Sequence, residues 1–148
     1  MKHRFPAAVA AVAIAIALAA SMAAADSAAK SVVTPVASVT WTPAGVPGVS
    51  IAPVEGDMTK GPSHFYLKYD AGFSAPMHHH SPDHYGTVVS GAITLTTDGK
   101  ETKLGPGSYF ALLGKAPHAA RVEGKEACVM FIDARGPWDV VMQDAAKK

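Results

Sequence analysis

The sequence predicts an all-β protein with one antiparallel β-barrel or sandwich domain. Three observations support this fold class. After residue 36 the chain is a series of short apolar runs separated by turns that contain glycine or proline. No segment of this part of the sequence has a sustained helical periodicity. The chain has 148 residues, of which 49% are hydrophobic and 17% charged, so it is long enough for one domain and apolar enough for a core.

The first 25 residues have the features of a secretory signal peptide. Lys2 and Arg4 precede an apolar run from Ala7 to Ala20, and small residues follow up to Ala25. The run has about 14 residues, whereas a helix needs roughly 20 to cross a bilayer. We therefore expect cleavage after Ala25, a periplasmic or secreted protein, and no stable membrane anchor.

The rest of the chain divides into a linker, a barrel and a tail. Residues 26–36 are rich in Ala, Ser and Lys without a pattern and predict a flexible linker. The barrel domain is expected over 37–142 and a short tail over 143–148. The clearest hairpin signal is the alternating segment 93–97, which Asp98 and Gly99 follow. The predicted strands are 39–42, 49–54, 64–69, 85–89, 92–97, 108–112, 118–122 and 127–133.

Charge and cysteine content exclude several classes of protein. The 13 basic and 12 acidic residues give a net charge of +1, which does not suggest a nucleic-acid-binding protein. A single cysteine, Cys128, excludes an intramolecular disulfide and zinc sites built on two or more thiolates. Because its neighbours are apolar, Cys128 is expected to be a small buried hydrophobic residue.

The histidines are the strongest candidates for a functional site. His78, His79, His80 and His84 fall within seven residues, and His118 begins a later predicted strand. In an extended segment His78 and His80 share one face, whereas His79 points to the other. The turn at 81–83 can return His84 to the side of the first two. Imidazoles in such a cluster suit zinc, copper, iron or nickel.

The spacing of these histidines resembles the first sequence motif of the cupin superfamily, G(X)5HXH(X)3,4E(X)6G. The match runs from Gly72 to Gly91 and agrees at every spacing. The one difference is His84, which stands where the family usually has Glu. Both glycines are expected at turns in which a side chain would be strained.

The second cupin motif, G(X)5PXG(X)2H(X)3N, is matched in part between Gly107 and His118. The first glycine and the histidine have the family's spacing, but Leu113, Lys115 and Val122 replace its Pro, second Gly and Asn. The resemblance implies a cupin barrel, which is a double-stranded β-helix or jelly roll. Residues 41–61 and the histidine motif also resemble a group of exported bacterial cupins of uncharacterised function.

By this resemblance the metal ligands are His78, His80, His84 and His118. Each is expected to bind as a neutral imidazole whose second nitrogen is held by an acceptor. Asp83 is the alternative to His84 if the strand register turns His84 away from the others. A site made only of nitrogen ligands favours Zn²⁺, Ni²⁺, Cu²⁺ or Fe²⁺ over Mn²⁺.

The resemblance leaves two main functions open. The first is a small metalloenzyme, dioxygenase- or isomerase-like, that acts on a small-molecule substrate at the open positions of the metal. For this function Tyr85, Tyr109 and Glu101 are the candidate acid–base groups. The second is a non-catalytic module that binds a metal or a small ligand, and a barrel with a vestigial site is the least favoured. Edge strands near 36–54 predict a homodimer.

Overall fold

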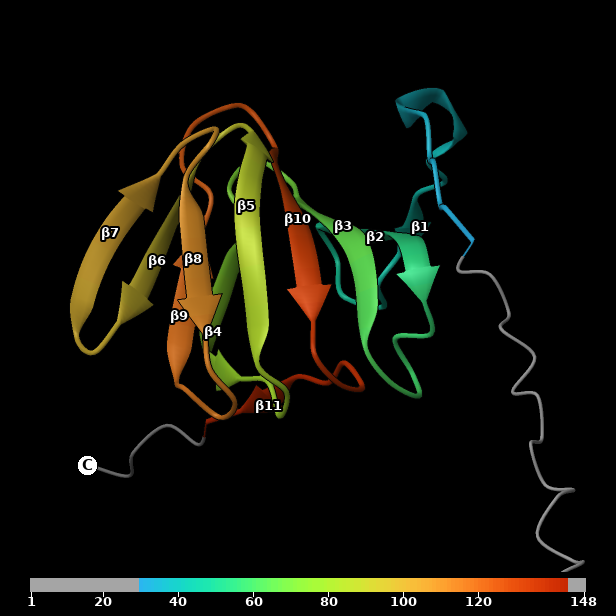
Figure 1. Ribbon diagram of the computed structural model, residues 1–148. Helices are drawn as coiled ribbons and strands as arrows, with labels where there is room; N and C mark the ends of the chain where they lie inside the picture. Colours follow the sequence, from blue (N-terminus) through green and yellow to red (C-terminus); the bar gives the residue numbers. More distant parts are fainter. Residues whose placement is uncertain (1–29, 144–148) are drawn as a thin grey trace, which may run out of the picture. The chain divides into compact units, whose positions relative to one another are not determined.

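The strands of the protein form two antiparallel sheets that pack face to face (Figure 1). The structure is a computed structural model that describes residues 30–143. Within this range it has one short 3₁₀ turn, Val36–Ser38, and no α-helix, so no helix there is long and apolar enough to cross a membrane. The all-β jelly-roll prediction is confirmed.

The first sheet, sheet A, has six strands in the order β1-β2-β3-β10-β5-β8. Sheet B has five strands in the order β11-β4-β9-β6-β7. The strands of sheet A are β1 (Thr42–Pro43), β2 (Val49–Gly56), β3 (Ser63–Tyr69), β10 (Cys128–Ala134), β5 (His84–Ser90) and β8 (Tyr109–Leu112). Those of sheet B are β11 (Val141–Met142), β4 (Ser74–His79), β9 (His118–Arg121), β6 (Ile93–Thr97) and β7 (Lys100–Leu104).

The hydrophobic core fills the space between the two sheets. Alternate residues of β3 and β10 are buried over the whole length of each strand, as the two-residue period of a strand requires. Phe65, Met130 and Ile132 from sheet A meet Ile93 from sheet B and are almost completely inaccessible. Cys128 is fully buried in this core and burial raises the pKa of its thiol to about 11, which confirms its prediction as a small hydrophobic residue.

The turns confirm two of the sequence signals. Asp98 and Gly99 both have positive φ, 50° and 73°, which is the conformation of a tight hairpin turn between β6 and β7. Gly91 has a φ of 71°, and a Cβ there would lie 2.1 Å from the carbonyl oxygen of Ala127. No other residue fits at position 91, because both the conformation and the space exclude a side chain.

The predicted strand at 39–42 is present only at its last residue, because the first strand, β1, covers Thr42–Pro43. The carbonyl of Pro35 accepts hydrogen bonds from the backbone N–H of Ser38, at 2.9 Å, and from its hydroxyl, at 2.7 Å. These bonds close a 3₁₀ turn, so the first strand begins only at Thr42. The predicted signal peptide, residues 26–29 of the predicted linker and residues 144–148 of the tail lie outside the described residues.

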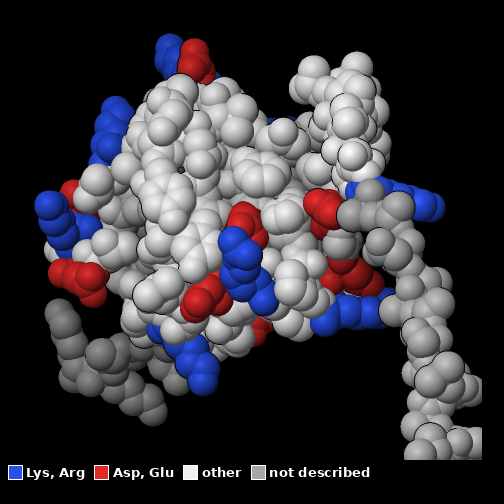
Figure 2. Space-filling model, viewed as in Figure 1, with Lys and Arg blue, Asp and Glu red and all other residues white. Residues whose placement is uncertain are grey.

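Figure 2 shows the molecule from the side of sheet A that faces away from the core. Basic and acidic side chains lie close together on this face, and uncharged residues occupy much of the area between them. The charges visible from this side therefore alternate in sign and do not form a continuous basic surface.

Candidate metal centre

Four buried histidines gather between the two sheets at one end of the sandwich. His78 lies in β4 directly opposite His118, the first residue of β9, and His80 follows β4 by one residue. His84 is the first residue of β5 in the opposite sheet. The four side chains are only 3–5% exposed. The fold thus brings together all four histidines that the cupin resemblance implies as ligands.

Three of these histidines form a compact trio. His78, His80 and His118 each offer a nitrogen, and the three nitrogens lie within 4.8 Å of one another. The rings of His78 and His118 are 4.3 Å apart between centroids, and that of His80 is 5.1 Å from His78 and 5.2 Å from His118. This spacing is short enough for one ion to contact all three imidazoles.

Each member of the trio is held through its Nδ1 atom by a backbone carbonyl. His78 donates to Pro76 at 2.7 Å and His118 donates to Ala116 at 2.9 Å. His80 donates to the carbonyl of Asp139, 59 residues further along the chain, at 2.5 Å. A carbonyl only accepts, so Nδ1 carries the proton and Nε2 keeps a free lone pair. The backbone therefore sets the tautomer that a metal ligand needs.

His84 lies beside the trio but is not one of its members. Its ring centroid is 4.7 Å from that of His80 and 5.8 Å from that of His118. The nearby Pro82 carbonyl acts to raise the pKa of His84, but its contact does not meet hydrogen-bond geometry, so this buried Nδ1 has no partner in the part of the chain that the structure describes. A buried polar atom without a partner costs free energy, which an ion or water beside His84 can recover.

Burial keeps the imidazoles neutral. It lowers the pKa of His80 to about 3 and those of His84 and His118 to about 4, because a charged imidazole loses its hydration between the sheets. The pKa of His78 is lowered for the same reason. At neutral pH all four side chains therefore present lone pairs and not positive charges.

The histidines line a small cavity in the otherwise filled interior. Its volume is about 20 Å³, room for one ion or one water molecule. Its other walls are apolar and include Leu95, Phe110, Met130 and Trp138. Neutral nitrogen donors around a space of atomic size fit a divalent transition metal.

Asp83, the alternative to His84 in the sequence, has a different role. Its carboxylate is exposed and accepts a hydrogen bond from the backbone N–H of Gly114 at 2.6 Å. The next residue, Lys115, donates from its backbone to the carbonyl of His80 at 2.8 Å. Asp83 therefore joins the 81–83 turn to the loop before His118, and both loops carry histidines of the site.

Trp138 and Asp139 complete the site and are not indicated by the sequence motifs. The ring of Trp138 stacks on His80 with centroids 3.9 Å apart, and its edge approaches His84 at 5.0 Å. The carboxylate of Asp139 accepts hydrogen bonds from the backbone N–H and hydroxyl of Ser81, at 2.7 and 2.5 Å. Both residues belong to segment 135–143, here called the C-terminal strap, which crosses the site after β10.

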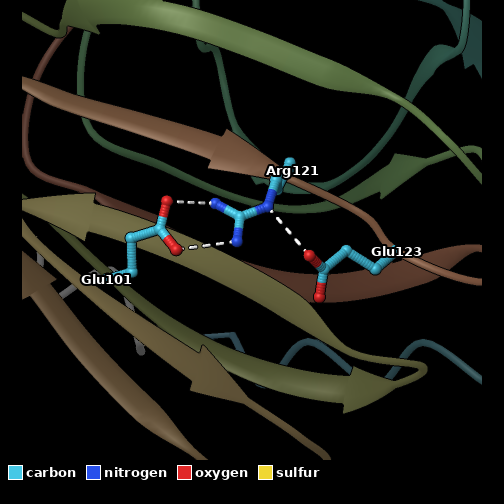
Figure 3. A network of polar contacts seen from close by, with 3 residues as sticks. All are labelled: Glu101, Arg121 and Glu123. Carbon is cyan, nitrogen blue, oxygen red and sulfur yellow. Dashed lines mark hydrogen bonds and ion pairs between the residues drawn. The ribbon is translucent and has the colours of Figure 1, made fainter.

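The proposed acid–base residues lie away from the histidines. Tyr85 and Tyr109 do not line the histidine cavity, and Tyr109 is 63% exposed at the edge of sheet A. Glu101 is held by the guanidinium of Arg121, at 2.5 and 2.8 Å, which in turn binds Glu123 at 3.0 Å (Figure 3). The hydrogen bonds from Arg121 lower the pKa of Glu101, so this residue ties β7 to β9 and is not a base of the site.

The segment that carries the four histidines matches a known protein family. Residues 65–133 match the family described as Cupin domain. Residues 65–133 of this chain are a cupin domain. This cupin also resembles many solved structures, including KdgF from Halomonas sp., with 21% identity, a TM-score of 0.61 and coverage of 72% of this chain and 94% of that chain.

Two further structures show the same fold. The polyketide cyclase RemF from Streptomyces resistomycificus has 16% identity and a TM-score of 0.65, with 80% of this chain and 89% of that chain covered. An RmlC-like cupin from Shewanella frigidimarina has 17% identity and a TM-score of 0.58, with 70% and 88% covered. No curated protein sequence matches this cupin. At these identities the likeness concerns the fold alone.

Proposed function

We propose that this cupin binds one divalent transition metal and acts on a small molecule as a metalloenzyme, dioxygenase- or isomerase-like. The observation that carries the proposal is the trio of His78, His80 and His118, whose Nδ1 atoms are anchored and whose Nε2 atoms are free. Burying polar side chains without partners is costly. A shared ion recovers this cost for all three imidazoles at once.

We assign His84 as the fourth ligand. It is buried, it lines the same cavity, and its Nδ1 lacks a protein partner. A site with four neutral imidazoles and no carboxylate leaves the charge of the ion uncompensated. Such a site favours Zn²⁺, Ni²⁺, Cu²⁺ or Fe²⁺ over Mn²⁺, which prefers oxygen ligands.

The protein's own residues prepare this site for a bound molecule. Trp138 covers His80 and keeps bulk water from it. Tyr69 lines the cavity, and burial raises its pKa to about 12, so its hydroxyl stays protonated and serves as a donor but not as a base. A bound metal supplies a Lewis acid with open coordination positions.

A non-catalytic metal-binding module is the second candidate. The cavity of about 20 Å³ is consistent with it, because this volume holds a single ion. The absence of Tyr85, Tyr109 and Glu101 from the cavity walls supports it further. The two candidates differ in one observable, which is turnover by the metal-loaded protein.

The test begins with the metal content of protein purified without an affinity tag. We expect close to one transition-metal ion per chain, and loss of that ion in His78→Ala, His80→Ala and His118→Ala. His64→Ala is the matched control, because His64 is a surface residue that pairs with Glu55 at 3.1 Å and lies outside the cluster. Equal metal content in all four variants would refute the proposed centre.

Oxygen uptake with a panel of diphenols and diketones then separates the two functions. Uptake that depends on the metal and disappears in His118→Ala supports the dioxygenase class. Isomerisation is detected by proton NMR, as a change in the spectra of the same compounds that occurs without oxygen uptake. Metal bound at full occupancy with no turnover of any compound favours the binding module.

We also propose that the protein is exported to the periplasm or secreted, on the basis of residues 1–25. Lys2, Arg4 and the short apolar run support this proposal. Mass spectrometry of the exported protein should find a chain that starts at Asp26. A membrane-bound protein that retains residues 1–25 would show that the run is an anchor.

A further inference from the structure

We infer that the molecule that reaches this metal centre is uncharged and largely apolar, with an oxygen-bearing head for the histidines and an apolar body that lies in a neighbouring groove. This inference rests on the proposed metal centre and names the substrate class for it. Three observations carry it: the size and lining of the groove, its continuity with the histidines, and the lack of a basic side chain in its walls.

The groove lies between the β2–β3 side of sheet A and β4 with the C-terminal strap. Its volume is about 400 Å³, within the range of small-molecule sites. The histidine cavity is about 20 times smaller, so the body of a bound molecule must lie in the groove. Most of the walls are apolar, and they include Val46, Val49, Ile51, Phe73, Val140 and Met142.

The groove is continuous with the histidine cavity. Leu67, Tyr69, His78, His80 and Trp138 line both spaces. A molecule in the groove therefore has its inner end against two members of the trio and against the tryptophan that stacks on His80. Tyr69 therefore brings a phenol side chain to the walls of both spaces.

The charge of the walls excludes an anionic body. Among residues 30–143 no Lys or Arg lines the groove, and its one carboxylate, that of Asp139, already accepts two hydrogen bonds from Ser81. A carboxylate or phosphate on the body of the ligand would be desolvated without a partner. An apolar body instead gains free energy in proportion to the surface that it buries.

The first experiment tests the groove without a metal. N-phenyl-1-naphthylamine, a neutral apolar dye whose fluorescence rises in apolar surroundings, is titrated into metal-free protein. We expect saturable binding that Val140→Lys weakens at least about 10-fold, because the new ammonium occupies the apolar wall. Val140 is 56% exposed, so the variant should fold. Val141→Lys is the matched control, because Val141 is the next residue but does not line the groove.

The second experiment displaces the dye with three compounds that share one head and differ in the body. Against catechol, 4-tert-butylcatechol should bind at least about 10-fold more tightly through its buried methyl groups. The anion 3,4-dihydroxybenzoate should bind at least about 10-fold more weakly, and Val140→Lys should restore part of that loss. Val46→Lys, at a position 53% exposed on another part of the wall, should repeat the result.

Loading the protein with Zn²⁺ separates the inference from the proposed function. Zinc should raise the affinity for all three catechols about 10-fold or more and leave the affinity for the dye unchanged. If zinc binds but the dye does not, or the three catechols bind equally, the inference is overturned and the metal centre stands. If zinc does not bind, the metal centre is refuted and with it the assignment of the ligand's head.

A second copy of the chain is the competing occupant of the groove. In that case the protein would be a dimer in sedimentation experiments, Val140→Lys would make it a monomer, and the dye would bind only to the variant. This result would overturn the inference, because the apolar walls would then form the interface of a dimer. Tight dye binding to the unmodified protein, whatever its oligomeric state, supports a small-molecule occupant.

Discussion

Lys115 adopts a backbone conformation that favours glycine. Its φ is 66°, and it stands where the second cupin motif has its second Gly. A left-handed residue other than glycine costs about 1–2 kcal/mol, part of which the higher chain entropy of glycine offsets. The turn is nevertheless kept, because the backbone N–H of Lys115 binds the carbonyl of His80 at 2.8 Å.

We therefore predict that Lys115→Gly stabilises the protein by about 0.5–1 kcal/mol. Lys115→Ala is the matched control, since it removes the same exposed side chain but keeps the strained conformation. Its stability should stay within about 0.5 kcal/mol of the parent. Urea unfolding of the metal-free proteins measures both changes. Equal stabilities of the Gly and Ala variants would show that the turn is not strained.

We predict that His84, the proposed fourth ligand, determines which metal the centre prefers. His84→Glu replaces a neutral nitrogen ligand by a carboxylate, which lowers the net charge of the loaded site and favours harder ions such as Mn²⁺ and Fe²⁺. His84→Ala should weaken metal binding about 10-fold or more, the scale on which even outer residues of metal sites act. Competition titrations with Zn²⁺ and Mn²⁺ measure both effects.

His79→Ala is the control for the His84 variants. His79 pairs with Val141 of β11, and its side chain points away from His78 and His80. Its loss should change metal affinity less than about 3-fold, well below the losses expected for ligand contacts. Unchanged affinity in His84→Ala together with loss in Asp83→Ala would assign the fourth position to Asp83.

At the scale of elements, the C-terminal strap holds the histidine cluster in place. The carbonyl of Asp139 orients His80, and its carboxylate binds the turn after His80 through Ser81. Burial alone would raise the pKa of this carboxyl, but the hydrogen bonds from Ser81 outweigh it and the pKa is lowered. β11 then pairs with β4, with Val141 opposite His79 and Met142 opposite His78.

We predict that Asp139→Ala lowers metal affinity about 10-fold, because the turn between His80 and His84 loses its anchor. The tryptophan fluorescence should also change, since Trp138 is the adjacent residue. Asp133→Ala is the control: Asp133 binds Arg135 at 2.7 Å, near the start of the strap, but does not line the histidine cavity. Equal metal affinity in the two variants would mean that the carboxylate of Asp139 is not needed to hold the turn after His80.

For the molecule as a whole, the buried histidines predict a loss of stability in mild acid. Their folded pKa values, about 3 for His80 and about 4 for His84 and His118, lie below the ordinary value of 6.5. The unfolded chain therefore binds protons below pH 6.5 that the folded chain does not bind. Stability is complete above pH 6.5 and falls as the pH decreases towards 4.

The midpoint of thermal unfolding of the metal-free protein should accordingly fall between pH 7.5 and pH 5. In that window the carboxylates are ionised in both states, so the histidines dominate the change. A double variant, His80→Gln with His118→Gln, should show a smaller decrease over the same range. A midpoint independent of pH in the parent protein would contradict neutral burial of these side chains.

A homodimer stays a prediction for the whole molecule. β1 is an edge strand of sheet A, and Trp41, which precedes it, is 36% exposed. Edge strands present unpaired backbone groups to a second chain. Sedimentation at micromolar concentration should give the mass of a dimer, and Trp41→Ala should weaken the association. A monomer under these conditions would contradict the prediction.

The fold could be predicted because its signals are local. The buried alternation of β3 and β10 and the turn at Asp98 and Gly99 need only neighbouring residues to be recognised. The turn over 36–38 was not predicted, since no local signal in Val36–Ser38 marks it. What decides its conformation is the pair of hydrogen bonds between Pro35 and Ser38.

The sequence by itself determined the β class, the cupin motif and the four histidines, because period and spacing are properties of the chain. Only the tertiary structure decided which histidine nitrogens are held by backbone carbonyls and which stay free. The backbone carbonyl that orients His80 belongs to Asp139, 59 residues further along the chain. Trp138, in the same strap, stacks on the ring of His80. Neither residue belongs to a sequence motif. Both reach the site because the strap returns across the sheet and is buried there, which depends on the fold and not on local spacing.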